Sequence, residues 1–219
     1  MPNMKFLKID GAHAVTKVGS EFVGYKKGEP ICNELVAFLK LEWLFISNMP
    51  KWEEWSFFEE EIEVTSDERR EDGAVESQKE NAQSVRLRLL PRLEQLGLDN
   101  CPKLRALPQQ LGEHTTSLKK LYLDETNSLK AVENLPHLTE LLHITKCGKL
   151  ERICNLPQLT ELRVHGCPNL IHVEGLESLQ RLWLGEDMQV VSSRWLAVLQ
   201  KQHRRLHGED LDVYTWSTS

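Results

Sequence analysis

The sequence lacks the features that mark membrane and secreted proteins. No apolar run approaches the roughly 18 residues that a transmembrane helix needs. The N-terminal residues contain no hydrophobic signal core, and no Asn-X-Ser/Thr glycosylation site occurs. The five cysteines are an odd number and form no dense disulfide framework. These absences exclude a membrane-spanning protein and predict a cytoplasmic location without a membrane partner.

Motifs that carry catalysis or bind metals are also missing. The sequence contains no H-E-x-x-H, G-x-S-x-G or G-x-G-x-x-G pattern and no C-x-x-C pair. Its formal net charge of −6 argues against a dedicated nucleic-acid binder. We therefore expect a protein that is not an enzyme, that needs no cofactor or metal and that does not bind nucleic acid.

Leucine and charge are both unevenly distributed. The first 86 residues contain 5 of the 35 leucines, and the other 30 follow. Residues 59–84 hold ten acidic and three basic side chains, a net of −7, so that the rest of the chain sums to +1. Self-repelling charge without an apolar face does not offset the entropy cost of ordering. We therefore predict a disordered acidic insert over residues 59–86, with an acidic docking segment as the alternative.

Apolar residues recur with a period of about twenty residues in the leucine-rich part. Counted from Leu159, they fall at offsets 3, 5, 8, 11, 14 and 17, and Leu179 begins the next unit. The unit that begins at Leu138 carries one extra residue, and the two upstream units, which begin at Met4 and Leu41, follow this rule of spacing more loosely. In one of these the rule selects the aromatic residues Trp52, Trp55 and Phe58. The seven units begin at Met4, Leu41, Leu93, Leu118, Leu138, Leu159 and Leu179.

The spacing within one unit predicts its structure. Apolar residues at offsets 3 and 5 alternate with polar ones, as in a half-buried strand. The later spacing of three suits turns or 3₁₀-like coil and is too brief for a long helix. One unit buries too little apolar surface to be stable alone, so the units must stack and share hydrogen bonds between strands. We therefore predict an α/β solenoid with short parallel strands along one face.

The L-x-x-L-x-L-x-x-C/N-x-L pattern of Leu93–Leu104 and Leu159–Leu170 resembles the leucine-rich repeat. Within it, Cys101–Leu104 and Cys167–Leu170 are similar to the C-P-x-L of intracellular plant disease-resistance proteins. The stretch Leu41–Trp55, which ends in Trp-Glu-Glu-Trp, resembles the coiled-coil subclass of nucleotide-binding, leucine-rich-repeat receptors. The resemblance implies a horseshoe with parallel strands on its concave face and irregular or 3₁₀ returns.

For function, the resemblance implies recognition of a pathogen effector or a guarded host protein, together with restraint of a nucleotide switch. The chain contains no G-x-x-x-x-G-K-[ST] loop, so that switch is absent from it. The chain would then be a C-terminal fragment, a truncated gene product or a decayed relative of such a receptor. Its expected partners are a protein ligand and a nucleotide-binding domain.

These observations divide the chain into four parts. Residues 1–58 form atypical N-terminal repeats, the acidic insert follows, residues 87–192 form regular repeats, and residues 193–219 form a C-terminal cap. The cap contains an amphipathic helix, for which membrane or nucleic-acid contact is the alternative to capping. The polar side of this helix holds Arg194, Lys201, Arg204 and Arg205. Its apolar side holds Trp195, Leu196, Val198, Leu199, Gln202 and Leu206. Residues Val213, Tyr214 and Trp216 complete the cap.

Three cysteines fall at offset 8 of their units, where the repeat points inward. We expect Cys101, Cys147 and Cys167 to pack as small buried hydrophobes. A metal or redox role is the alternative, but no C-x-x-C pair supports it. His143 belongs to the outward set of residues, so it should not converge with Cys147.

The outward positions of the strands are the best candidates for a binding site, because repeat arrays bind partners on extended surfaces. Tryptophan, tyrosine and arginine are the residue types that most often dominate interfaces. We therefore select Trp43, Phe45, Tyr122, Arg163 and Trp183 as protein-binding residues on the concave face. The alternative for each is that the side chain only covers a neighbouring one.

Other assignments remain open on the sequence. A leucine-rich-repeat substrate adaptor of a ubiquitin ligase predicts an F-box-like helical segment, which the first forty residues do not contain. An extracellular receptor domain predicts a signal peptide, glycosylation sites and paired capping cysteines. A degenerate, non-functional receptor fragment is a further alternative, because the first two units follow the repeat only loosely.

Overall fold

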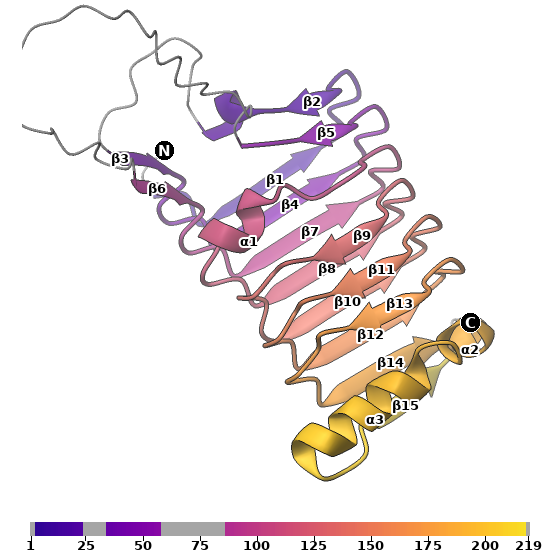
Figure 1. The fold of residues 1–219 in the computed structure, drawn as a ribbon. Coiled ribbons are helices and arrows are strands. Elements are labelled where there is room, and N and C mark those ends of the chain that lie inside the picture. Colours follow the sequence, from indigo (N-terminus) through magenta and orange to yellow (C-terminus); the bar gives the residue numbers. More distant parts are fainter. Residues whose placement is uncertain (1–2, 24–33, 58–85, 218–219) are drawn as a thin grey trace, which may run out of the picture.

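The structure, a computed structural model, describes residues 3–23, 34–57 and 86–217. Its main feature is a parallel sheet of eight strands in the order β1-β4-β7-β8-β10-β12-β14-β15 (Figure 1). Neighbours in this main sheet follow one another along the chain, so each unit adds one strand. The α/β class and the short parallel strands are thereby confirmed. The strands are β1 (Phe6–Asp10), β4 (Trp43–Ser47), β7 (Gln95–Asp99), β8 (Lys120–Asp124), β10 (Leu141–Thr145), β12 (Glu161–His165), β14 (Arg181–Gly185) and β15 (Asp212–Trp216).

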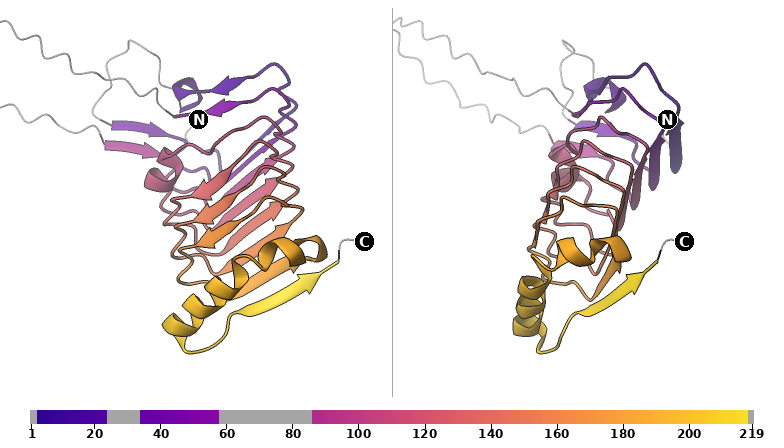
Figure 2. Two further views of the ribbon diagram at one scale, coloured as in Figure 1. Left: turned by 45° about the vertical axis from the view of Figure 1, so that its right-hand side comes forward. Right: turned by 90° about the vertical axis from the view of Figure 1, so that its right-hand side faces the viewer.

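Shorter strands lie in the return segments between the main strands. They are β2 (Lys17–Val18), β3 (Glu34–Ala37), β5 (Glu54–Trp55), β6 (Arg86–Leu89), β9 (Ala131–Glu133), β11 (Arg152–Cys154) and β13 (His172–Glu174). The strands β9, β11 and β13 form a three-stranded parallel sheet. Strand β2 pairs with β5, and β3 pairs with β6, both also in parallel. The main sheet and the strands β2, β5, β9, β11 and β13 form two layers of one stack, while the β3–β6 pair projects from its side (Figure 2).

The prediction of irregular or 3₁₀ returns is wrong for these segments. Stacking brings the backbone of each return beside the next, and their N–H and C=O groups pair because buried backbone groups need partners. Among the described residues, 3₁₀ helices occur only at η1 (Ser20–Val23) and η2 (Glu186–Met188). A short helix, α1 (Gln110–His114), follows the return in the longer unit that begins at Leu93.

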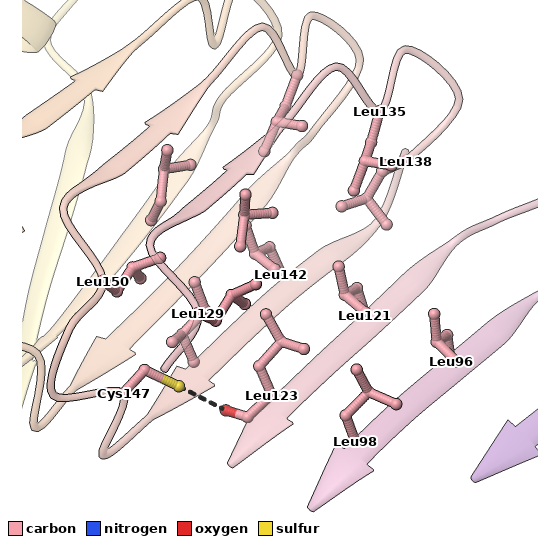
Figure 3. Packing of buried hydrophobic residues seen from close by; sticks show 14 of the residues in the cluster. Leu96, Leu98, Leu121, Leu123, Leu129, Leu135, Leu138, Leu142, Cys147 and Leu150 are labelled. Atoms are coloured by element: carbon pink, nitrogen blue, oxygen red, sulfur yellow. Dashed lines mark hydrogen bonds between the residues drawn. The ribbon is translucent and has the colours of Figure 1, made fainter. Parts of the chain in front are cut away.

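The predicted inward residues fill the space between the two layers. Leu121 and Leu123 of β8 and the corresponding leucines of neighbouring strands lie on one side of the main sheet (Figure 3). From the Leu93 unit to the Leu179 unit, every inward residue is buried except Leu107, which is half-buried. The predicted core is therefore confirmed. Burial of each such side chain contributes about 2 kcal/mol.

The inward cysteines are buried, as predicted. The Sγ of Cys147 lies 3.9 Å from the carbonyl oxygen of Leu123, on the preceding strand (Figure 3). Burial raises the pKa of the Cys101 thiol to about 11. The adjacent Cys147 thiol, together with burial, also raises the pKa of Cys167. We therefore expect Cys101 and Cys167 to stay protonated and to act as core residues.

The first two units are packed less completely than the later ones. Leu7 and Ile9 of β1 are only partly buried, because β1 is an edge strand of the main sheet. In the next unit Trp52 and Trp55 are buried, as predicted, and so is Phe57. Phe58, which the repeat selects as the final inward residue, lies outside the described residues. So do residues 59–85 of the predicted insert.

A residue in the left-handed backbone conformation follows most of the main strands and turns the chain away from the sheet. Glycine and asparagine adopt this conformation at low cost, whereas glutamate and lysine do so rarely. Because all four types occur here, the residue type alone does not reveal the turn. The residues are Gly11, Asn48, Asn100, Glu125, Lys146 and Gly166, with φ between 48° and 71°.

The C-terminal segment lies at the end of the stack, against the unit that begins at Leu159 and against β14. It comprises α2 (Gln189–Ser192), α3 (Leu196–His207) and β15, and the Nε1 of Trp195 donates to the carbonyl oxygen of Leu170 at 3.1 Å. The predicted apolar side of the helix is partly wrong, since Val198 and Leu206 are exposed while His203 is buried. The segment begins earlier than residue 193 and, unexpectedly, adds an eighth parallel strand.

Candidate functional site

The outer face of the main sheet carries the residues at the first, third and fifth positions of each strand. Parallel pairing in register places equivalent positions of neighbouring strands side by side, about 4.8 Å apart. The third positions form a central row that crosses the whole sheet. In order, this central row is Lys8, Phe45, Gly97, Tyr122, His143, Arg163, Trp183 and Tyr214.

Arg163, Trp183 and Tyr214 form the C-terminal cluster of the outer face. The rings of Trp183 and Tyr214 are stacked, with centroids 4.4 Å apart and planes inclined by 21°. The guanidinium carbon of Arg163 lies 5.6 Å from the centroid of the Trp183 ring, within cation–π range. The indole Nε1 of Trp183 is buried and has no hydrogen-bond partner among the described residues. The cluster is therefore an ordered, mostly apolar platform with a charged margin.

Glu161 fixes the orientation of the two nearest arginines. Its side-chain oxygens accept hydrogen bonds from Arg163 Nε at 2.5 Å and from Arg181 Nε at 2.8 Å. Only 7% of Glu161 is exposed, so this buried charge is compensated by two guanidinium groups. The ion pairs hold Arg163 beside the Trp183 ring and leave other N–H donors of both arginines available.

Tyr122 and His143 lie between the two ends of the central row. Their rings meet edge to face with centroids 6.2 Å apart. Burial, assisted by the nearby positive charge of Arg163, lowers the pKa of His143. His143 is therefore neutral at pH 7, where it adds a polar ring but no charge to the outer face.

Phe6, Trp43 and Phe45 form the N-terminal cluster of the outer face. Their ring centroids are 6.1 to 6.5 Å apart, and Phe6 and Trp43 are 54% and 41% exposed. A cavity of about 330 Å³ opens beside them and is lined also by Lys8, Ile46, Ser47 and Asp99. Exposed aromatic rings around a cavity are typical of a recognition surface.

All five residues selected from the sequence lie on the outer face, in three groups. Trp43 and Phe45 belong to the N-terminal cluster, Arg163 and Trp183 to the C-terminal cluster, and Tyr122 lies between them beside His143. No described contact joins the two clusters, because three strands of the main sheet separate β4 from β12.

The selection from the sequence missed Phe6 and Tyr214. Phe6 was available, since the repeat counted from Met4 places it at the same outward offset as Trp43. Tyr214 follows no repeat, and the β-branched and aromatic residues of Val213–Trp216 are the signal that could have indicated a strand there.

Within residues 3–23, 34–57 and 86–217, no group of three histidine, cysteine or acidic side chains is arranged to hold a metal ion. None of the helices in these ranges has the length and apolarity of a membrane span. Comparison of the chain with protein-family models, with curated proteins and with solved structures gives no match in any of the three.

Proposed function

We propose that the chain is a leucine-rich-repeat solenoid that binds a protein ligand through its outer face. The observation that carries the proposal is the C-terminal cluster, in which ion pairs and stacking hold Arg163, Trp183 and Tyr214 in place on a sheet face that no described element covers. Side chains that are ordered before binding lose little entropy on binding, and these residue types dominate interfaces. In a curved solenoid this face would be the concave one.

The resemblance noted in the sequence gives this binding a cellular role. In a plant disease-resistance receptor the ligand would be a pathogen effector or a guarded host protein, and a nucleotide-binding domain would be the second partner. Restraint of a nucleotide switch is a population shift, so the repeat surface must bind one switch state better than the other. The chain contains no such switch, so it can only bind or compete.

The binding site is tested with a double variant and a matched control. Full-length chain is applied to an array of purified effectors from plant pathogens and purified plant proteins. We expect the combination of Trp183→Ala and Tyr122→Ala to weaken binding of any captured ligand at least tenfold. The control combines Arg152→Ala and His172→Ala, two exposed residues paired in register on the return sheet, and should bind normally.

Circular dichroism of both double variants separates binding from folding. The proposal requires an unchanged spectrum in the outer-face variant. Loss of fold there would mean that Trp183 and Tyr122 are structural, and ligands insensitive to both substitutions would place binding elsewhere. The receptor assignment is tested separately, by reading the genomic DNA upstream for a nucleotide-binding domain. A different upstream domain would contradict it.

A further inference from the structure

The shape of the N-terminal cluster and the charge around it indicate what kind of side chain would bind there. Its three rings are nearly equidistant, at 6.1, 6.4 and 6.5 Å. Such a triangle offers several aromatic faces to one group placed above its centre. The ring of Phe45 lies over Gly97, where a Cβ atom would come within 2.3 Å of it. Gly97 therefore allows the ring to lie low and leaves the cavity above it open.

One carboxylate borders this cavity, and a second lies beside the first on the next strand. Asp99 lines it, is exposed and has no ion pair among the described residues. Asp124 is its neighbour in the sheet register, and the Oδ1 atom of Asp124 is buried without a hydrogen-bond partner in the described part of the chain. Burial and the charge of Asp99 raise the pKa of Asp124. This edge of the cavity therefore has negative charge that the nearby Lys146 offsets only in part.

The nearby cations are engaged with other carboxylates. The Nζ of Lys146 is 2.9 Å from Glu125, and the Nζ of Lys8 is 3.9 Å from Asp10. Lys8 also lines the cavity, so its charge opposes an incoming cation from one side. Asp10 offsets that charge, while Asp99 and Asp124 on the other side form no ion pair within the described part of the chain, although the charge of Lys146 attracts both.

We propose that this cavity binds an arginine side chain of the protein ligand, with its stem against Phe6, Trp43 and Phe45 and its guanidinium group at Asp99. A planar guanidinium stacks on aromatic rings and pairs with carboxylates at the same time. An apolar side chain would cover the rings but leave both carboxylates unpaired, and an acidic one would be repelled. The inference names the chemistry of a ligand at the proposed binding face, so it rests on the proposed function.

The test uses a small probe, so that it does not depend on finding the natural ligand. N-acetyl-arginine methylamide is titrated into full-length chain labelled with ¹⁵N at tryptophan, which gives six indole signals. Trp43→Phe identifies the signal of Trp43. We expect a saturable shift of this signal, with a Kd on the order of millimolar for a single exposed contact. The neutral isostere N-acetyl-citrulline methylamide should produce a much smaller shift.

Removing a charge beside the cavity should change the affinity for the arginine probe, in a direction that depends on the sign of the charge removed. Asp99→Asn should weaken arginine binding about threefold to fivefold, as expected for an exposed ion pair. Lys8→Gln should strengthen it, because the opposing charge is removed. The control Asp212→Asn removes a carboxylate from the far end of the outer face and should leave the affinity unchanged.

Three results would overturn the inference: equal binding of the citrulline probe, an equal shift of the Trp183 signal, or no effect of Asp99→Asn. None of these results would contradict the proposed function if the binding of array ligands still depends on Trp183 and Tyr122. Conversely, arginine binding at Trp43 with no dependence of any array ligand on the outer face would contradict the proposed function alone.

Discussion

Gly97 determines how the aromatic residues of the outer face are arranged. It is the only central-row residue without a side chain, and the ring of Phe45 occupies the space that a Cβ atom would need. Glycine normally weakens a strand, so its presence in β7 needs a packing reason. The low position of the Phe45 ring supplies that reason.

We predict that Gly97→Ala destabilises the protein by about 1 kcal/mol, because the new methyl group displaces the Phe45 ring. It should also abolish the arginine-dependent shift of the Trp43 indole signal. The control Gly148→Ala places a methyl group 3.3 Å from a single amide oxygen of Asn127 and should have a smaller effect. Equal stability of the two variants in urea denaturation would contradict this role for Gly97.

Asp124 lowers stability at neutral pH. Burial and repulsion from Asp99 raise its pKa in the native state above that of the unfolded chain. The native state therefore binds the carboxyl proton of Asp124 more tightly than the unfolded chain does. The resulting loss of stability grows as the pH rises through the native pKa of Asp124. We predict that Asp124→Asn stabilises the protein by about 0.5 kcal/mol at pH 7, and by less at pH 4. Urea denaturation at both pH values checks this, and a larger gain at pH 4 would disprove it.

At the scale of elements, few side chains of α3 are buried against the stack. Leu199 is 2% exposed and packs into the core, whereas Val198, the preceding residue, is 62% exposed. We predict that Leu199→Ala costs about 2–4 kcal/mol, while Val198→Ala changes stability by less than about 0.5 kcal/mol. Guanidinium denaturation of both variants measures the difference. Similar costs would mean that the helix does not cover the end of the core.

The elements that could be predicted are those with a repeated pattern. Leu162 and Val164 alternate with polar residues in β12, and this pattern alone determines which side of each main strand is buried. The strand β15 lies beyond the last repeat and could not be found in this way. The return strands have two to four residues each, too short for a periodic signal, and they form because stacking aligns their backbones.

The sequence predicts which face of the main sheet carries the candidate site, but it does not predict which residues on that face come into contact. The repeat places Trp43, Tyr122 and Trp183 outward, and the structure agrees. Which of them come together depends on contacts between strands, such as the pairing of β14 with β15 that brings Tyr214 onto Trp183. A single sequence does not contain that information, because β15 belongs to no repeat.

At the scale of the whole molecule, each unit adds one strand beside the previous one. Every neighbouring pair of the main sheet is parallel, and all but the last pair of strands come from successive repeats. Energetic coupling is then limited to neighbouring units, and the outer face grows with the number of repeats. The two aromatic clusters lie towards opposite ends of this face, so a ligand that contacts both must be extended.

Pulsed electron paramagnetic resonance tests this arrangement most directly. Nitroxide labels are attached to cysteines that replace Asp212 and either Lys120 or Phe6, in a chain with Cys32 and Cys154 changed to serine. Four and seven strand spacings separate these pairs, so we expect Cα distances of about 19 Å and about 34 Å. Equal distances for the two pairs, or a shorter one for Phe6, would contradict a sheet built from successive units.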